Sequence, residues 1–584
     1  MPGRRRPGWG IGWRAGWRWV PVATVSLLLV GSCAQIPTSG PVDRGAPVQG
    51  TEDDPQVRVL PRGPVAGQSP QEVVSGFLDA SASFEDDHGV ARRFLTPRAS
   101  EQWNPDAGVT VLDDFPRPQY VVKGSRVRVL AEQTALISAD GAFMPRGGVE
   151  VERTFTVRPE GDSWRIAALP QGLTLDRLDV SLAFRSFDTY FTNPSGSRLV
   201  ADPVYLPVTG SGSATSLVQA MLDGPTRWLR PAVASAIPPG TRLVVDSVPI
   251  ANGIAQVDLS AELLEATPEE LERAAAQLTS TLLELSPTVT GVSVSVEGSA
   301  LQLPSEPAVF TSDTWDKFDP DTLTPALGAL FVRNGVVRRI DGDLRPVVQG
   351  ALGTGAFDVQ SPSQSWSGGI VTALDPAAAE LLVTRPFLSQ QIVSRRSGRQ
   401  LLPATIDGDD RVWSLDVGGA NPTLEVWTGG EWRAASIQAP EGLIRSFRVS
   451  VDGTRMAIVL RREVGRQIRS ELMVGRVVAR GGGLRVEAFR RIERSITRVR
   501  HASWVDDSTL VVVGSTSGST IQPTLLNINR TVSELPSDLL VSATSVVGAP
   551  GLPLLAGTPG GEIYAAAPAA WRRLAFGRDP AYPG

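Results

Sequence analysis

The residue best placed for covalent chemistry is Cys33, the only cysteine in this chain of 584 residues. Two small residues, Gly31 and Ser32, precede it, and before them residues 20–30 form an apolar run. Five arginines and no acidic residue come before that run. A basic start followed by a short apolar core is typical of an export signal, and this run is too short to span a bilayer. We therefore expect a cleaved leader, with the Cys33 thiol as the group that is modified.

The sequence Val30-Gly31-Ser32-Cys33 resembles the bacterial lipoprotein signal, or lipobox, with valine in place of the more common leucine. The resemblance implies cleavage between Ser32 and Cys33 and transfer of a diacylglycerol to the Cys33 sulfur. It also implies acylation of the new amino terminus, which gives an N-palmitoyl, S-diacylglycerol cysteine. A buried free cysteine is the alternative, disfavoured because a leader takes no part in a folded core. We expect a protein held by lipid at the cell membrane, on its extracytoplasmic side.

The leader also bears on the export route and on the net charge of the mature protein. Arg5-Arg6 could indicate twin-arginine export, but residues 7–9 are Pro-Gly-Trp rather than an apolar stretch, so we favour the general secretory route. Removing residues 1–32 takes away five arginines and no acid, which changes the net charge from −5 to −10. A protein with this acidic balance does not attract nucleic acid. With no second cysteine, apolar burial must stabilise each core.

The chain offers few residues for acid–base or metal chemistry. We expect its two histidines, His88 and His501, to be surface or packing residues, which disfavours a Ser-His-Asp hydrolase. Residues 514–518 have threonine at the nucleophile position of a G-x-S-x-G motif. Ligands for zinc are too few, and neither lysine follows a phosphate-binding glycine loop. The sequence therefore predicts a non-enzymatic protein without catalytic, cofactor or metal residues, although two carboxylates on a propeller face could still serve a glycosidase.

The chain divides into segments of different composition and periodicity. After the leader it is first rich in proline, glycine and small polar residues, and then shows helical and strand patterns. The predicted fold class is multi-domain, with two α+β domains followed by an all-β propeller. The predicted segments are a lipoprotein signal peptide (1–32), a flexible tether (33–68), an α+β domain (69–194), a second α+β domain (195–305), a linker (306–326) and a β-propeller domain (327–584).

The first α+β domain is predicted from two helices and a following sheet. Ser69 and Glu72 form a capping box at the start of the first helix, and a second helix is expected after Asp87, ending before Pro97. Helices followed by a curved antiparallel sheet resemble the NTF2-like, cone-shaped domains. The segments whose alternation predicts strands are residues 120–122, 127–130, 149–157 and 164–167.

The second α+β domain has a more specific pattern. A leucine-containing helix at residues 216–222 is followed by Gly-Pro, then by an Ile-Pro-Pro-Gly-Thr turn, and Val-Asp-Leu-Ser at residues 257–260 precedes a long helix. Thr267 and Glu270 form a capping box for that helix, and residues 292–296 follow as an alternating strand. These features resemble the GerMN domain, which is found in exported bacterial proteins of spore germination and envelope function.

Beyond residue 326 the helical pattern disappears and short strands alternate with turns. Residues 374–383, 450–459 and 501–513 share one design, an acidic turn followed by an apolar strand. Because a four-stranded blade needs about 40 to 50 residues, the remaining length predicts five or six blades. A pair of β-sandwiches is the alternative, disfavoured because the unit recurs across the region. The polar segment before the propeller offers no apolar face and predicts a linker.

The order of lipobox, NTF2-like domain, GerMN domain and propeller resembles the actinobacterial lipoprotein LpqB family along nearly the whole chain. The resemblance implies an accessory protein that binds the extracytoplasmic domain of the sensor histidine kinase MtrB and regulates the MtrA/MtrB two-component system, cell-wall homeostasis and division. The alternative is a cell-wall glycan-binding or glycan-processing lipoprotein. A central propeller pocket with two facing carboxylates favours the alternative, whereas a capped channel and an apolar patch on an α+β domain favour a protein partner.

Overall fold

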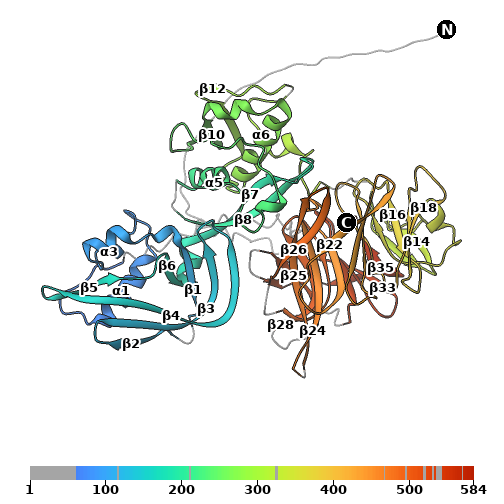
Figure 1. Cartoon of the computed structure of the whole chain (residues 1–584). Coiled ribbons are helices and arrows are strands. Elements are labelled where there is room, and N and C mark those ends of the chain that lie inside the picture. Colours follow the sequence, from blue (N-terminus) through green and yellow to red (C-terminus); the bar gives the residue numbers. More distant parts are fainter. Residues whose placement is uncertain are drawn as a thin grey trace, which may run out of the picture. The chain divides into compact units, whose positions relative to one another are not determined.

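The computed structural model shows two α+β domains and a strand-rich propeller along the chain (Figure 1). The described residues are 61–114, 117–208, 212–304, 306–322, 327–465, 467–492, 496–516, 521–528, 532–534, 542–567 and 570–584. The predictions made for the leader, for Cys33 and for most of the tether therefore lie outside the described residues.

The first domain begins with the predicted capping box. The Ser69 hydroxyl accepts a hydrogen bond from the Glu72 N–H at 3.3 Å, and the Glu72 carboxylate accepts one from the Ser69 N–H at 2.7 Å. The second helix ends before Pro97, as predicted, and Pro97 also begins a further helix, α3. Its fixed φ suits the first position of that helix, which Thr96 caps. The helices are α1 (Pro70–Ser81), α2 (Gly89–Arg92), α3 (Pro97–Gln102) and, after the sheet, α4 (Arg177–Ala183).

The sheet of the first domain is mixed. Its strand order is β5-β4-β3-β1-β6, with β2 paired to β3, and only the β1–β6 pair among these described strands is parallel. Each predicted strand segment lies in β2, β3, β4 or β5. Phe77, Trp103 and Phe155 join helices and sheet in one apolar core, which confirms an α+β domain. The strands are β1 (Gly108–Leu112), β2 (Gln119–Lys123), β3 (Arg126–Ser138), β4 (Phe143–Glu160), β5 (Ser163–Ala168) and β6 (Leu173–Asp176).

The second domain is built around a parallel β-α-β unit. Strands β10 and β11 pair in parallel, and helix α6 connects them and covers the sheet. The capping box predicted at its start is present, since the Thr267 N–H donates to the Glu270 carboxylate at 2.8 Å. The elements are β7 (Phe184–Thr192), β8 (Leu199–Pro207), α5 (Ser213–Leu222), β9 (Ile250–Ala251), β10 (Ile254–Leu259), α6 (Pro268–Leu283), β11 (Gly291–Val296) and β12 (Ser299–Ala300).

The β7–β8 hairpin lies at the start of the second domain. The predicted boundary between residues 194 and 195 falls in the turn of this hairpin. Strand β7 packs on α6 through two hydrogen bonds of Tyr190. Its N–H donates to the Thr281 hydroxyl at 3.0 Å, and its carbonyl accepts from the Gln277 amide at 3.1 Å. The whole hairpin therefore goes with the second domain.

The predicted linker, residues 306–326, is folded in its described part. Residues Ser312–Trp315 form a 3-10 turn, and Trp315 is 2 % exposed in the core of the second domain. Its indole N–H donates to the Thr279 hydroxyl at 3.1 Å, with Phe310 beside its ring. The expectation that this segment has no apolar face is wrong, because a single large aromatic side chain is enough to hold it.

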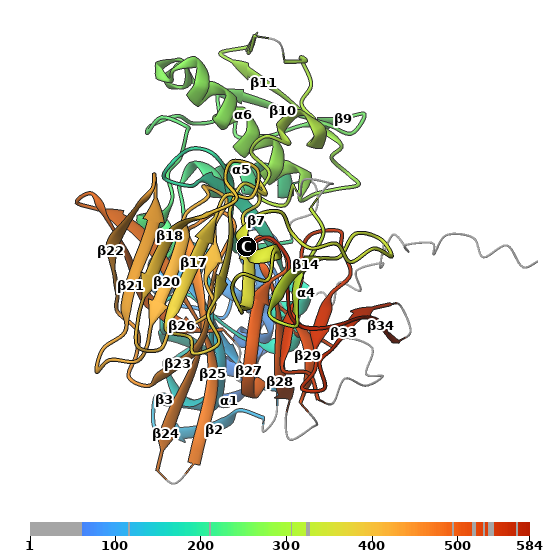
Figure 2. The ribbon, with the colours of Figure 1, turned by 90° about the vertical axis from the view of Figure 1, so that its right-hand side faces the viewer.

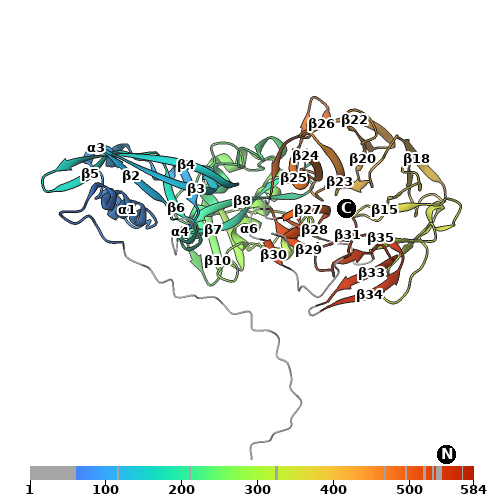
Figure 3. The same ribbon diagram turned by 90° about the horizontal axis from the view of Figure 1, so that it is seen from below.

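The propeller has six blades among the described residues, at the upper limit of the prediction. The innermost strands of successive blades are β15, β19, β23, β27, β31 and β35, which contact each other around the axis. Figure 3 shows the blades arranged around the C-terminus. The strands are β13 (Leu330–Arg333), β14 (Val336–Arg339), β15 (Gln360–Gln364), β16 (Val371–Leu374), β17 (Glu380–Thr384), β18 (Ile392–Ser397), β19 (Thr405–Ile406), β20 (Val412–Asp416), β21 (Thr423–Thr428), β22 (Glu431–Ile437), β23 (Leu443–Val449), β24 (Arg455–Val464), β25 (Gln467–Arg480), β26 (Gly483–Arg491), β27 (Ile496–Trp504), β28 (Thr509–Thr516), β29 (Gln522–Asn527), β30 (Val532–Glu534), β31 (Ser545–Val547), β32 (Leu555–Gly557), β33 (Glu562–Ala566), β34 (Trp571–Phe576) and β35 (Arg578–Ala581).

The ring is closed by strands from its two ends. Strand β35 pairs antiparallel with β13, through Leu330 opposite Ala581 and Val332 opposite Arg578. One blade therefore combines β13 and β14 with β35, and no edge of the inner ring is left open at this point.

Of the three sequence segments with an acidic turn before an apolar strand, two have that turn at the same place in their blades. Asp452 and Asp506 lie in the loops that join the first and second strands of their blades, whereas Asp375 lies between the second and third strands. The third equivalent loop is instead that of Asp407, between β19 and β20. The repeat therefore indicates a shared kind of acidic turn and not one fixed position in the blade.

Candidate functional site

The predicted lipidation and cleavage residues, Cys33 and Ser32, lie outside the described residues. In the part of the chain that the structure describes, no helix is long and apolar enough to cross a membrane. Over the same residues, no group of three or more His, Cys, Asp or Glu side chains is arranged to hold a metal ion.

His88 is a packing residue in the first domain. It is 4 % exposed, and its ring lies 4.8 Å from that of Phe84 and 5.7 Å from that of Trp103, measured between centroids. Burial lowers the pKa of His88, which keeps the imidazole neutral. Its environment is aromatic, and the nearby Asp87 is engaged by Arg92 at 2.7 Å.

His501 lies on β27, inside the propeller. Burial and the nearby Arg448 guanidinium lower the pKa of His501 to about 3. Its Nδ1 accepts a long hydrogen bond, 3.5 Å, from the Val546 N–H of the next blade. His501 and His88 belong to different domains, so the structure does not bring the two histidines together.

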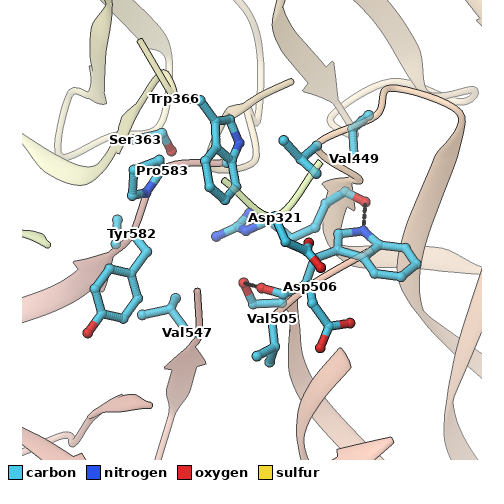
Figure 4. Close-up of a pocket in the computed structure, with 16 residues that line it drawn as sticks. Asp321, Ser363, Trp366, Val449, Val505, Asp506, Val547, Tyr582 and Pro583 are labelled. Carbon is cyan, nitrogen blue, oxygen red and sulfur yellow. Dashed lines mark hydrogen bonds between the residues drawn. The ribbon is translucent and has the colours of Figure 1, made fainter. Parts of the chain in front are cut away.

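A pocket opens at the end of the propeller axis where the inner strands finish. Aromatic side chains of Trp366, Trp504 and Tyr582 line it together with Arg448 and the carboxylates of Asp321 and Asp506. Figure 4 shows Asp321 among side chains that come from several blades. The space inside measures about 30 Å³, which is room for about two water molecules.

The two carboxylates of this pocket are both engaged by backbone groups. Asp506 accepts from the N–H groups of Ser508 at 3.0 Å and Thr509 at 2.6 Å, which fixes the β27–β28 turn. Asp321 accepts from the N–H of Asp507 at 3.1 Å. Burial and the neighbouring Asp506 carboxylate raise the pKa of Asp321 to about 8, and burial raises that of Asp507 well above its ordinary value. Asp321 therefore lines this pocket as a largely protonated group at neutral pH.

The β7–β8 hairpin of the second domain contacts the same face of the propeller. The Asn193 amide donates to the Asp452 carbonyl at 3.2 Å, and the Ser197 hydroxyl donates to the Asp409 carboxylate at 2.7 Å. Arg198 donates to the Asp319 carbonyl at 3.1 Å. These contacts hold the hairpin turn and the end of the predicted linker against two propeller loops, the β19–β20 loop and the β23–β24 loop.

A second set of contacts lies along the β24–β26 blade. Arg455 is 1 % exposed and donates to the Ala201 carbonyl of β8. The Trp228 indole donates to the Ala488 carbonyl at 2.9 Å, and the Arg490 guanidinium lies 4.0 Å from the centre of the Trp228 ring. Arg476 donates to the Trp228 carbonyl at 2.7 Å. The second domain and the propeller are thus joined by buried polar contacts as well as by the chain.

Asp321 and the loop aspartates were not predicted as members of one site. A usable signal exists, because Ile406-Asp407-Gly408 and Val451-Asp452-Gly453 repeat one turn in consecutive blades, and Val505-Asp506-Asp507 repeats it with aspartate in place of glycine. Asp321 carries no such signal, since its role depends on where the linker folds.

Three family models match the three domains of the chain. The model "Lipoprotein LpqB, N-terminal domain" matches residues 63–181, "Sporulation and spore germination" matches 188–302, and "Lipoprotein LpqB beta-propeller domain" matches 334–583. Among solved structures, TolB of Acinetobacter baumannii is 15 % identical over 44 % of this chain and 66 % of its own, with a TM-score of 0.33. The first GerMN domain of GerM from Bacillus subtilis is 21 % identical over 22 % of this chain and 98 % of its own, with a TM-score of 0.19.

Two relatives that match along nearly their whole length are both named "Lipoprotein LpqB". "Lipoprotein LpqB" of Streptomyces coelicolor is 28 % identical over 100 % of this chain and 99 % of its own. "Lipoprotein LpqB" of Thermobifida fusca is 30 % identical over 97 % of this chain and 98 % of its own. With family models for LpqB matching both its N-terminal and its propeller region as well, the chain belongs to the LpqB lipoprotein family.

Proposed function

We propose that this chain is a lipid-anchored, extracytoplasmic accessory protein that binds the extracytoplasmic domain of the sensor histidine kinase MtrB and thereby regulates the MtrA/MtrB system, cell-wall homeostasis and division. The observation that carries the proposal is the match to lipoprotein LpqB chains over nearly the whole length. The name of these relatives supports a lipid anchor, and Cys33 is the residue we assign to it. No catalytic step and no cofactor enter the proposal.

Two structural features support a protein partner. The axial pocket, which Asp321 lines, has room for about two waters only. On the first domain, Leu178 and Leu182 are 60 % and 64 % exposed, and they lie one turn apart on α4. Exposed leucines on one helix face are a feature of protein-binding surfaces. We therefore assign α4 as the first surface to test for the kinase.

The test is binding between the purified kinase domain and this chain from Ala34 onward, measured by pull-down and calorimetry. We expect saturable binding that falls at least tenfold in a Leu178→Asp, Leu182→Asp variant, because a charge at each position prevents apolar contact. Leu264→Asp is the matched control, since Leu264 is also 60 % exposed but belongs to the second domain. Absence of binding at high micromolar concentration would reject the partnership, and an equal loss in the control would reject α4.

A cell-wall glycan ligand is the second candidate, because aromatic rings and two carboxylates do meet in the axial pocket. Trp366, Trp504 and Tyr582 could stack on sugar rings, and Asp321 and Asp506 could supply a carboxylate pair. The pocket must first widen, because the present space is far smaller than a sugar. Saturable binding of cell-wall glycan together with no kinase binding would favour this candidate.

A further inference from the structure

One stretch of this acidic protein is strongly basic. Residues 461–500 contain twelve arginines and four glutamates, with no lysine or aspartate, whereas the whole chain has a net charge of −5. This stretch covers the end of β24, the strands β25 and β26, and the start of β27. Figure 2 shows the β24–β25 hairpin extending past the neighbouring strands. The positive charge is therefore concentrated on the β23–β26 blade, its protruding hairpin and the first strand of the next blade.

The arginines near the hairpin end are placed against each other rather than spread apart. Arg462 and Arg469 lie directly opposite each other in the β24–β25 register. Like charges in this position destabilise a strand pair unless an anion lies between them. Glu471 supplies one anion, because its carboxylate pairs with Arg462 and, at 3.1 Å, with Arg491. Arg469 has no carboxylate partner among the ion pairs of the described residues, and its side chain donates a long hydrogen bond, 3.5 Å, to the Gln467 side chain.

A hollow of about 500 Å³ lies beside this hairpin, between β25–β26 and β27. Arg469, Arg491 and Arg498 line it, and Glu471 is its single acidic side chain among the described lining residues. Since Glu471 is already engaged by Arg462 and Arg491, the surface that faces solvent is positive. Arg498 is also held at a φ of +50°, a left-handed conformation that is unfavourable for a residue with a side chain. The β-bulge between β27 and β28 fixes it there.

An apolar side chain accompanies these charges. Ile468, which also lines the hollow, is 55 % exposed and adjoins Arg469 at the start of β25. An arginine guanidinium can bond two oxygens of one phosphate. An exposed isoleucine among arginines suits the region of a membrane where lipid headgroups meet acyl chains. Residues 34–60 separate the predicted anchor from the described chain and span at most about 97 Å when extended. An anchor at Cys33 thus keeps the start of the described chain within that length of a bilayer.

We propose that the β24–β25 hairpin and the adjoining hollow form a binding surface for the phosphate headgroups of an anionic lipid bilayer. Arg469 and Arg498 contact the phosphates, and Ile468 enters the interface. The nearness of a bilayer rests on the lipid anchor of the proposed function, whereas the affinity of these arginines for headgroups does not. Local positive charge of this density attracts an anionic surface even though the whole protein is acidic.

The test uses the unlipidated chain from Ala34 onward, which contains every described residue. Co-sedimentation is measured with vesicles of phosphatidylcholine alone and with vesicles containing phosphatidylglycerol. We expect at least tenfold tighter binding to the anionic vesicles, weakening as salt is added. Arg469→Gln with Arg498→Gln should abolish this preference. Arg480→Gln with Arg572→Gln is the matched control, because it removes the same charge from exposed positions away from the hollow and should bind like the parent.

Competing outcomes are distinguishable in the same assay. Equal binding to both kinds of vesicle, or equal loss in the two double variants, would overturn the proposal. Saturation by inorganic phosphate or soluble polyphosphate without vesicle binding would identify a soluble anion as the ligand and would also overturn it. Thermal unfolding of each variant shows whether the fold is kept, and Ile468→Ser gives a second variant that leaves the charges unchanged and should weaken anionic-vesicle binding several-fold. None of these results depends on kinase binding.

Discussion

The backbone N–H of Asp507, in the propeller, donates a 3.1 Å hydrogen bond to the carboxylate of Asp321, in the segment that precedes the propeller. Asp506 lies beside them, and Asp188 of β7 adds a further carboxylate to the surroundings of Asp507. Arg455 is the cation that most affects Asp507. A buried group of carboxylates with few cations holds together only when it keeps protons.

We predict from this arrangement that Asp321→Asn changes the pH dependence of stability. The pKa of Asp321 is raised to about 8 in the folded protein and is near 3.8 in the unfolded chain. The protonated Asp321 side chain therefore stabilises the fold at low pH, and this stabilisation is lost as the pH rises through about 8. Between pH 5 and pH 9 the free energy of unfolding of the parent should fall, relative to the variant, by at least the ~1.4 kcal/mol of one pKa unit. Urea unfolding at each pH measures it.

The control for this prediction is Asp316→Asn. Asp316 belongs to the same segment but is exposed, so its removal should leave the pH profile of the parent unchanged. A parent and an Asp321→Asn variant with parallel profiles would show that Asp321 is ionised in the folded state.

We predict that Trp315→Ala destabilises the second domain and frees the segment that leads to the propeller. The side chain is 2 % exposed, and its indole N–H bonds the Thr279 hydroxyl of α6 at 3.1 Å. Replacing a buried tryptophan by alanine costs about 3–5 kcal/mol. Urea unfolding should show that loss, and limited proteolysis should show faster cleavage near residues 306–322. Phe576→Ala, which removes a 52 % exposed ring, should change neither measurement.

The parts of the fold that the sequence predicted are those encoded over a few residues. Both capping boxes, Ser69 with Glu72 and Thr267 with Glu270, are present because cap and third helical residue are close in the chain. The alternating strands also lie where their two-residue period puts them. The GerMN-like order of helix, strand and helix in the second domain depends on such local signals.

What the sequence did not predict depends on contacts between distant residues. Pairing of β13 with β35 joins residues at opposite ends of the propeller, and no local pattern indicates it. The burial of Trp315 depends on the surface of α6, and the position of Asp321 depends in turn on Trp315. The lipidation residue lies outside the described part of the chain and stays a prediction.

We predict that His501→Gln makes the protein less sensitive to acid without affecting partner binding. The pKa of His501 is lowered to about 3 in the folded state, against about 6.5 in the unfolded chain. Below pH 6.5 the unfolded chain therefore takes up a proton that the folded protein does not, so stability is full above pH 6.5 and falls as the pH falls toward 3. The parent should therefore lose, relative to the variant, at least the ~1.4 kcal/mol of one pKa unit between pH 7 and pH 4. Thermal or urea unfolding across this range is the measurement.

His88→Gln extends the same test to the first domain. Burial lowers the pKa of His88 as well, so its replacement should also reduce acid sensitivity, although lost packing against Phe84 and Trp103 should lower stability at every pH. Both variants should bind the kinase domain like the parent. A folded variant that no longer binds would give that histidine a role in the interface.

We predict that Cys33→Ala leaves the protein without its anchor. The chain has no other thiol, so no other side chain can form the thioether to diacylglycerol. Membrane fractionation of cells should show an unprocessed or released protein in place of a processed, membrane-bound one, and processing of the parent should be sensitive to globomycin. Ser32→Ala is the matched control, because alanine keeps a small residue before the cleaved bond and should be processed normally. Unchanged, globomycin-sensitive processing of Cys33→Ala would contradict the lipobox assignment, and it would also remove the reason for expecting the propeller to lie near a bilayer.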